Sequence, residues 1–420
     1  MGAVHVNLQT LLRRAATPAN LRAVRLGIER EGQRITPTGQ LATTDLMPAL
    51  VAGAPAIQRD FAESQLELVT PVATTTSQAF EQLTTIHRTV YQHLAGELIW
   101  PLSTPPALPV NQTNIQIAKL ADSGAVAYRE HLAQHYGRRR QMISGVHVNV
   151  ELAPALLTAM FRLQTQEASF TAFRNHVYVH AAQNYLRYRW LMTYLFGCSP
   201  MGAANFFAPG APRPTHAVRS LRNSHYGYHN DAGVRVSYAS LAQYLDDLQR
   251  LVATNQLSAA KEFYGQVRLR GGHGVLDVGR TGIEYLELRD LDLNPFAPTG
   301  ITQQQLATVY GFLLLMLWLP APADSDAAVL TGAQRNDVVA LEDPLERTRY
   351  QAEGAWLVEQ LTAMVTALGF PDERIAVAGL TITLKHPEQT LAAQWRAACA
   401  LVPEASLALR LAREAAQRWR

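Results

Sequence analysis

The sequence feature that most constrains this chain is the alternation of polar and apolar residues over positions 282–295. Because successive side chains of a strand point to opposite faces, Glu287 and Arg289 share one face of this run. Leu286 and Leu288 fall on the other face, which predicts that this face packs against helices. A carboxylate and a guanidinium two residues apart then point away from the core. On its own, the run favours a surface strand with an internal ion pair.

Two earlier segments show a related pattern. Glu29 and Glu31 share one face of an extended run over residues 25–31. His147 lies on the polar face of residues 145–150, with valines on the other face. Each has an ordinary structural reading, namely a solvated strand for the glutamates and a hydrogen-bonded structural residue for the histidine. The functional reading is a set of ligands for a hard cation.

A further strand is predicted within residues 60–71, which end in a proline. Glu63, Gln65 and Glu67 alternate there with a serine and two leucines, so a polar face is again backed by a largely apolar one. Asp60 stands just before the strand. Because the acidic pattern recurs in separate strands, we expect these strands to contribute to one polar surface.

Between the strands, apolar residues recur at helical spacing. This spacing predicts helices over residues 77–98, 115–136, 154–196, 238–262, 302–319 and 350–368, and from about 388 to the end. A polar loop is expected around 320–334. Residues 271–274 are glycine-rich but lack the ending of a phosphate-binding Walker A loop, so we expect a hairpin tip.

Composition limits the classes of function. The chain has 420 residues, of which 48% are hydrophobic, and this predicts a folded protein with a large core. A net charge of +3 argues against nucleic acid as the main partner. Two cysteines are too few for a disulfide framework and fit a reducing cytoplasm. No apolar run is long enough to span a membrane, and no signal peptide is recognisable.

Together these patterns predict a polar sheet face that carries several potential metal ligands. The residues concerned are Glu29, Glu31, Glu67, His147 and Glu287, with Asp60 at a strand entrance. Unpaired buried carboxylates are costly, so this face either meets solvent or lines a cup that holds cations. Arg222 and Arg289 would complement phosphate oxygens from the other side. Carboxylates, a metal and arginines around a phosphate are typical of phosphoryl transfer.

The motifs along the chain resemble those of glutamate–cysteine ligase. They are Gly27–Glu31, Asp60–Glu63 with Glu67 and Thr70-Pro71, Trp100–Ser103, Ile143–Asn149, Tyr194–Gly197 with Ser199-Pro200, and Gly282–Pro298. The likeness is to the proteobacterial-type enzyme and to the ligase module of bifunctional glutathione synthetases. It runs in order from about residue 20 to 320.

The resemblance implies an α+β fold similar to that of glutamine synthetase, in which a curved antiparallel sheet forms a cup with helices outside. It implies one catalytic domain over residues 1–420, with a helical C-terminal portion from about residue 321. The implied reaction is the ATP-dependent ligation of the γ-carboxylate of glutamate to the amine of cysteine through a γ-glutamyl phosphate. Magnesium, or manganese, is the implied metal and ATP the co-substrate.

The resemblance also implies individual roles. The metal ligands are Glu29, Glu31, Asp60, Glu67, His147 and Glu287. Arg222 and Arg289 stabilise charge on the transferring phosphoryl group. The substrate-binding residues are Phe61, Tyr128, Arg129, Tyr228 and Tyr264, of which Arg129 is the candidate partner of a substrate carboxylate.

The sequence departs from the family pattern at Ser224–Tyr228, where His225 and Tyr226 replace the more usual Asp-Ile. This leaves open a ligase of the same mechanism with a different amine acceptor, and a catalytically idle, metal-binding relative. No second ATP-dependent domain is recognisable, so the expected product is γ-glutamylcysteine rather than glutathione. We expect a cytoplasmic monomer or weak oligomer that acts on small molecules.

Overall fold

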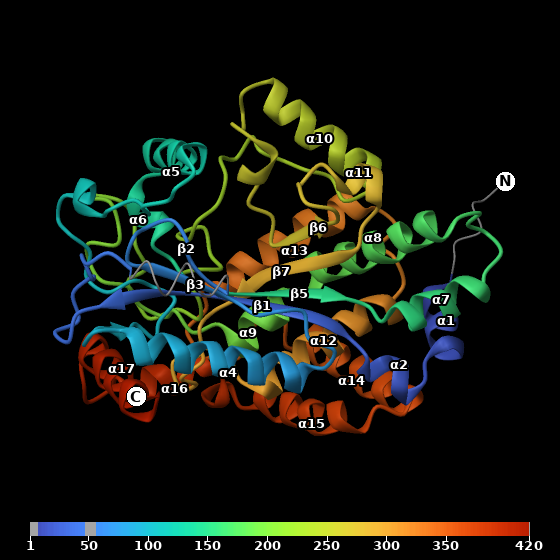
Figure 1. The fold of residues 1–420 in the computed structure, drawn as a ribbon. Coiled ribbons are helices and arrows are strands. Elements are labelled where there is room, and N and C mark those ends of the chain that lie inside the picture. The colour runs from blue at the N-terminus through green and yellow to red at the C-terminus, as the bar shows by residue number, and fades with distance from the viewer. Residues whose placement is uncertain (1–6, 47–55, 420) are drawn as a thin grey trace.

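A seven-stranded antiparallel sheet forms the centre of the computed structural model, which describes residues 7–46 and 56–419 (Figure 1). The strand order is β2-β3-β1-β5-β7-β6, and β4 pairs with β1 outside this path. The strands are β1 (Arg25–Ile35), β2 (Ile57–Arg59), β3 (Gln65–Val69), β4 (Leu98–Ile99), β5 (Val146–Glu151), β6 (Val267–Arg270) and β7 (Tyr285–Leu291). The three acidic strands predicted from sequence, β1, β3 and β7, therefore belong to one sheet, together with the histidine-bearing strand β5.

Helices lie on both sides of this sheet. Those in the first half of the chain are α1 (Leu8–Ala15), α2 (Pro18–Arg22), α4 (Thr76–His93), α5 (Ser123–His135), α6 (Arg138–Gln141), α7 (Pro154–Arg162), α8 (Phe170–Tyr188) and α9 (Trp190–Phe196). Those in the second half are α10 (Leu241–Ala253), α11 (Val278–Thr281), α12 (Gln303–Trp318), α13 (Ser325–Ala340), α14 (Gln351–Leu368), α15 (Pro371–Lys385), α16 (Leu391–Ala398) and α17 (Glu404–Trp419). In Figure 1, α5, α6 and α10 lie above the sheet, and α4, α12 and α17 lie below it.

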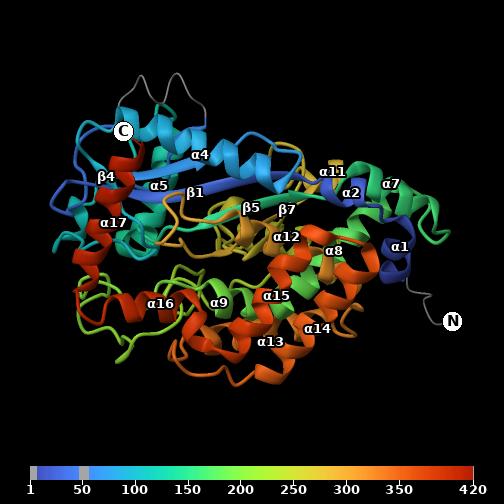
Figure 2. The same cartoon turned by 90° about the horizontal axis from the view of Figure 1, so that it is seen from below.

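The apolar side chains of the central strands form the main core with these lower helices. Val148, Leu286 and Leu288 are fully buried, as the alternation in sequence predicts. Helix α4 contacts β1 and β3, and α8 and α9 contact β7. Figure 2 shows α4 running along β1. Helix α12 packs in turn against α4 and α8, and nearly all of its residues are buried. Among the described helices, none has the length and hydropathy needed to cross a bilayer.

Several predicted boundaries are wrong, and capping residues explain where the helices begin. The loop predicted around residues 320–334 extends only to residue 324, because α13 begins at Ser325 with the side chain of Asp324 accepting a hydrogen bond from the Ala327 amide at 3.0 Å. The helix predicted from residue 115 begins only at Ser123, after Asp122. Both aspartates satisfy amides that the first helical turn leaves without a partner. The short strands β2, β4 and β6 and helix α15 were not predicted.

Strand β3 is also shorter than predicted, and this changes the place of Glu63. The residue lies in the turn between β2 and β3, not in the strand. Its carboxylate accepts hydrogen bonds from Arg59 Nε at 2.8 Å, from the Leu46 amide at 2.8 Å and from the Lys119 amide at 2.9 Å. Glu63 is therefore a structural anchor, whereas Glu67 stays on the strand.

Candidate active site

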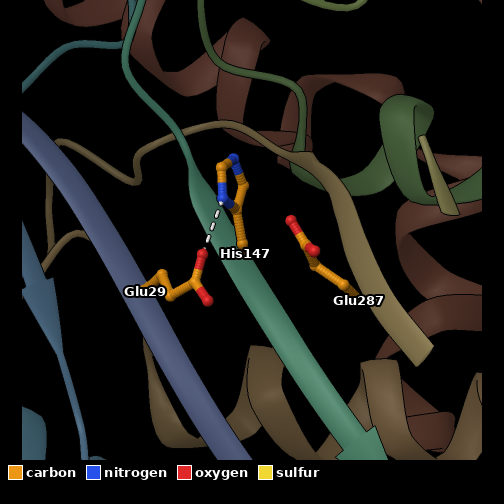
Figure 3. Close-up of side chains that lie close together, drawn as sticks. All are labelled: Glu29, His147 and Glu287. Atoms are coloured by element: carbon orange, nitrogen blue, oxygen red, sulfur yellow. Dashed lines mark hydrogen bonds and ion pairs between the residues drawn. The ribbon is translucent and has the colours of Figure 1, made fainter. Parts of the chain in front are cut away.

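The centre of the polar sheet face holds a cluster of two carboxylates and one imidazole. Glu29 lies opposite His147 across β1 and β5, and Glu287 lies opposite Asn149 across β5 and β7. Potential ligand atoms of Glu29, His147 and Glu287 all lie within 4.8 Å of one another (Figure 3). Residues far apart in the sequence meet here because the strand register aligns them on adjacent strands.

His147 links this cluster to a second glutamate. Its Nδ1 lies 3.3 Å from Glu29 Oε2, and its Nε2 lies 3.3 Å from Glu31 Oε1. Burial, followed by the charge of Arg289, holds the pKa of His147 well below its usual value. The imidazole is therefore neutral at physiological pH, which is the form that binds a metal.

The other three predicted ligands, Glu31, Asp60 and Glu67, lie close together and carry excess negative charge. Glu67 faces Glu31 across β1 and β3, and the Gly145 amide donates a hydrogen bond to Glu31 Oε2 at 2.8 Å. Burial and the neighbouring Asp60 raise the pKa of Glu31 to about 8. Burial, and then Asp60 and the other glutamates, raise the pKa of Glu67 well above its usual value. A divalent cation would relieve this repulsion and favour the ionised carboxylates.

Glu287 has a different environment, because arginines surround it. Burial alone would raise its pKa, but Arg289 and Arg268 hold the pKa of Glu287 below the usual value. Arg289 forms an ion pair with Glu287 through Nη1, and Arg270 Nε lies 3.4 Å from the same carboxylate. Arg289 Nε is buried and has no hydrogen-bond partner among the described residues. The Arg289 guanidinium thus keeps donor capacity for a ligand.

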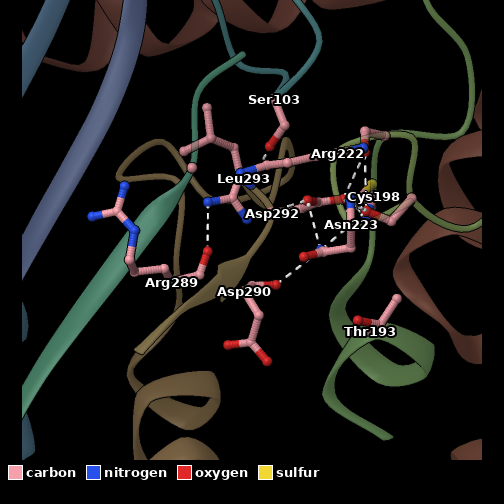
Figure 4. Close-up of polar contacts among 12 residues, drawn as sticks. Ser103, Thr193, Cys198, Arg222, Asn223, Arg289, Asp290, Asp292 and Leu293 are labelled. Carbon is pink, nitrogen blue, oxygen red and sulfur yellow. Dashed lines mark hydrogen bonds and ion pairs between the residues drawn. The ribbon is translucent and has the colours of Figure 1, made fainter. Parts of the chain in front are cut away.

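The second predicted catalytic arginine, Arg222, is fixed from behind by a buried polar network (Figure 4). Its Nη2 donates to the Arg289 carbonyl at 2.6 Å, and its Nη1 lies 3.9 Å from Asp292. Asp292 also accepts hydrogen bonds from the hydroxyls of Ser199 and Ser220, each at 2.7 Å. In the described part of the chain, Arg222 Nε and Nη1 have no hydrogen-bond partner. These two nitrogens are therefore available to an anion.

A pocket of about 310 Å³ opens beside these groups. All of the predicted substrate-binding residues line it, together with Glu31, Asp60, Arg222 and Arg289; they are Phe61, Tyr128, Arg129, Tyr228 and Tyr264. The rings of Tyr228 and Tyr264 meet edge to face at 4.5 Å, and the Arg289 guanidinium lies 5.2 Å from the Tyr264 ring. Arg129 Nε donates to the Asp60 carbonyl at 2.5 Å. The pocket thus joins an aromatic wall to the carboxylate and arginine floor.

Other lining residues of this pocket were not predicted from the sequence, namely Arg140, Gln141, Lys261, Glu262 and Arg268. Lys261 Nζ lies 4.1 Å from the centre of the Tyr128 ring. Lys261 and Glu262 were assigned to a helix, but α10 ends at Ala253 and Asn255 has a left-handed backbone. The alternation of β6 was the signal that could have identified Arg268 on the same face as Arg270.

An antiparallel sheet that carries this ligand cluster, beside a pocket with two partly unpaired arginines, defines a candidate metal-dependent enzyme site. The family model described as glutamate-cysteine ligase matches residues 9–258 and 250–337. The chain belongs to the glutamate–cysteine ligase family, which confirms the resemblance seen in the motifs.

Relatives and solved structures agree with this assignment. The chain is 41% identical over 390 residues to the bifunctional glutathione biosynthesis protein GshAB of Enterococcus faecalis, covering 92% of this chain and 52% of that protein. The crystal structure of a bifunctional glutathione synthetase from Pasteurella multocida has a TM-score of 0.89 and 37% identity, covering 98% of this chain and 54% of that one. Glutamate–cysteine ligase from Francisella tularensis shares the fold, with a TM-score of 0.87 and 23% identity over 95% of this chain and 89% of that one. The chain spans about half the length of the curated relatives it matches.

Proposed function

We propose that this chain joins the γ-carboxylate of L-glutamate to the amine of L-cysteine at the expense of ATP, giving γ-glutamylcysteine for glutathione biosynthesis. The observation that carries the proposal is that three tyrosines and two arginines line the same pocket in a chain of this family. They are Tyr128, Tyr228, Tyr264, Arg222 and Arg289. The carboxylate attacks the γ-phosphorus of ATP and ADP leaves. The amine then attacks the carbonyl carbon of the γ-glutamyl phosphate, and inorganic phosphate leaves.

The donor set fits Mg²⁺ or Mn²⁺. Five carboxylates and one neutral imidazole offer mainly oxygen ligands, and the raised pKa values of Glu31 and Glu67 indicate a local shortage of positive charge. Glu29, His147 and Glu287 would form one set of ligands, and Glu31, Asp60 and Glu67 would form the other. Bound metal would neutralise charge on the ATP phosphates and polarise the transferring phosphoryl group.

The arginines would stabilise negative charge on the phosphoryl oxygens that do not contact the metal. Arg289 is held by Glu287, so its planar guanidinium is oriented before the substrate binds. Arg222 is held by the Arg289 carbonyl and keeps Nε and Nη1 for phosphoryl oxygens. Both side chains would therefore act without further reorganisation.

The aromatic wall would bind the acceptor. The hydroxyls of Tyr128 and Tyr228 are kept protonated, because burial raises both pKa values, that of Tyr128 to about 12. Protonated hydroxyls can donate to the carboxylate of cysteine, as can the guanidinium of Arg129. The unusual residue His225 does not line the pocket and instead lies 3.0 Å from Asp337. This favours cysteine over a different amine acceptor.

On the larger scale, we infer that the polar sheet face is the concave floor of a cup like that of glutamine synthetase. Residues 1–420 would form one catalytic unit, whose helices after about residue 321 support the sheet. We further propose that the enzyme works in the cytoplasm as a monomer or weak oligomer.

Release of ADP in the presence of glutamate, with and without cysteine, tests the proposed reaction. Dipeptides formed from cysteine, 2-aminobutyrate, cysteamine and glycine in competition are weighed by mass spectrometry. We expect cysteine and 2-aminobutyrate to react and cysteamine to react poorly, because a site built for the carboxylate leaves polar groups unpaired without it. Preference for glycine or cysteamine would overturn the acceptor assignment, and absence of ADP release would overturn the ligase itself.

A further inference from the structure

Arg30 differs from its neighbours on β1 in the direction of its side chain. Glu29 and Glu31 point to the polar sheet face, so Arg30 points to the opposite face. There it is only 2% exposed and lines a second pocket of about 290 Å³. The other walls come from α4, β4, residues 295–298 and α17. This pocket is separate from the one that holds the proposed substrates, because the two share no lining residue.

The guanidinium of Arg30 is enclosed but not neutralised. Its Nε and Nη1 are buried and have no hydrogen-bond partner among the described residues. None of the ion pairs found in that part of the chain involves Arg30. An arginine guanidinium stays charged at neutral pH, so the Arg30 side chain is a buried cation. A buried cation with two unpaired nitrogens is unfavourable, and a bound anion would compensate it.

Two glycines shape the space that the guanidinium occupies. A Cβ atom at Gly32 would lie 2.1 Å from Arg30 Nη1. At Gly300, which has a φ of +81°, a Cβ atom would lie 3.1 Å from Arg30 Nε. The Arg30 side chain therefore packs between the backbone of Gly32 and the backbone of Gly300, where it lines the pocket.

The remaining walls indicate the kind of anion. Ile99, Phe296 and Leu411 give the pocket apolar surface, and Arg418 of α17 adds a second cation. Glu414 also lines the pocket, and its carboxylate forms an ion pair with Arg410 at 3.7 Å. A ligand that fits would carry an anionic group at Arg30 and an apolar body against the other walls.

We propose that the pocket between β1 and α17 is a second binding site, which takes a small organic anion through Arg30. The anionic group is a carboxylate or a phosphate, since both match the planar fork of a guanidinium. The site does not depend on the ligase reaction, because it lies on the other face of the sheet.

Isothermal titration calorimetry on the full chain tests this site, with phenylacetate, phenyl phosphate and the neutral phenylacetamide as probes. We expect one or both anions to bind saturably, and the stronger of the two identifies the preferred anionic group. Phenylacetamide should bind at least tenfold more weakly, because it cannot form the charge-assisted hydrogen bonds. Equal binding of the amide, or no binding of either anion at millimolar concentration, would overturn the proposal.

Variants of the two pockets show in which of them the probe binds. Arg30→Met should weaken anion binding by about 10- to 100-fold, whereas Arg129→Met, in the other pocket, should leave it unchanged. If Arg30→Met fails to fold, Ala415→Phe fills the pocket from α17 without touching β1 and should give the same loss. Glu414→Gln removes a repulsive charge and should strengthen binding. Loss of binding in Arg129→Met together with normal binding in Arg30→Met and Ala415→Phe would place the probe in the substrate pocket and refute the second site.

Discussion

At the scale of single residues, charge balance distinguishes the two halves of the candidate metal site. Glu287 is surrounded by arginines, whereas Glu31 and Glu67 have other carboxylates as close neighbours. Glu287 is therefore stable as an anion, whereas Glu31 and Glu67 are unstable as anions until a cation binds. This difference determines what a neutral substitution of Glu67 should do to stability.

Glu67→Gln should abolish turnover and yet stabilise the metal-free protein. At neutral pH the substitution removes the cost of burying or protonating a carboxylate beside Asp60, Glu29 and Glu31, so the melting temperature in EDTA should rise by a few degrees. With Mg²⁺ the gain should shrink or reverse, because the parent then gains stability from the bound ion and the variant gains less. Differential scanning calorimetry in the two buffers measures both effects. If the variant melts at a lower temperature than the parent in EDTA, the neighbouring carboxylates do not destabilise the Glu67 side chain.

Substitution of Arg289 should affect the chemical step. Arg289→Ala should lower kcat by roughly 10²–10³-fold, as is typical when a preorganised charge is removed. Arg289→Lys keeps the charge but loses the fork, so it should remain impaired. Arg250→Lys on the exposed face of α10 is the matched control and should leave kcat unchanged. If Arg289→Lys equals the parent in single-turnover kinetics, the guanidinium does not contact the phosphoryl group.

At the scale of elements, the residue before β5, Gly145, lies directly against the Arg222 guanidinium. A Cβ atom at Gly145 would lie 2.2 Å from Arg222 Nη2 and 2.4 Å from Cζ, so alanine would displace the guanidinium. Gly145→Ala should therefore lower kcat by roughly 10²-fold, the loss typical of a misplacement of about 1 Å. Gly233→Ala, with its nearest contact at 3.5 Å, should be neutral. Normal kcat in Gly145→Ala would mean that the position of Arg222 is not critical.

Helix α13 offers a test that separates stability from activity. Asp324→Ala removes the N-cap and should lower the free energy of unfolding by about 0.5–2 kcal/mol. Asp324→Asn keeps a hydrogen-bond acceptor and should retain most of the stabilisation that the N-cap provides. The kcat at 25 °C should be normal in both, because Asp324 lies outside the substrate pocket. Urea unfolding and initial rates give the two quantities, and equal stability of Asp324→Ala and the parent would contradict the cap.

The sequence predicted the central strands well because their pattern has a period of two, which also determines the faces on which Glu29, His147 and Glu287 lie. Which strands are neighbours does not follow from that pattern, and the strand order was not predicted. Strands such as β2 and β4, with three and two residues, are too short to show a period. The roles of Lys261 and Glu262 were missed because they follow a helix whose end depends on a single backbone angle at Asn255. Arg30 was read as part of a motif, and only the structure shows that its buried Nε and Nη1 have no hydrogen-bond partner among residues 7–46 and 56–419.

At the scale of the whole molecule, metal removal is the broadest test. Excess EDTA should abolish product formation, and added Mg²⁺ or Mn²⁺ should restore it. Because the cluster is short of positive charge without metal, saturating Mg²⁺ should also raise stability, by about 2.7 kcal/mol at 100 times its dissociation constant. Thermal unfolding against metal concentration measures this. Full activity in excess chelator would contradict the metal site.

The distance in sequence between Glu29 and Glu287 has a consequence for how the protein is made. At about 5–20 residues per second, the ribosome adds Glu287 roughly 13–52 s after Glu29. During that interval β1 and β5 can pair, but the β7 edge of β5 has no strand to cover it. An uncovered edge is a template for pairing with another chain. Newly made chains should therefore be most prone to aggregate before β7 emerges, and slow translation of this region would prolong that period.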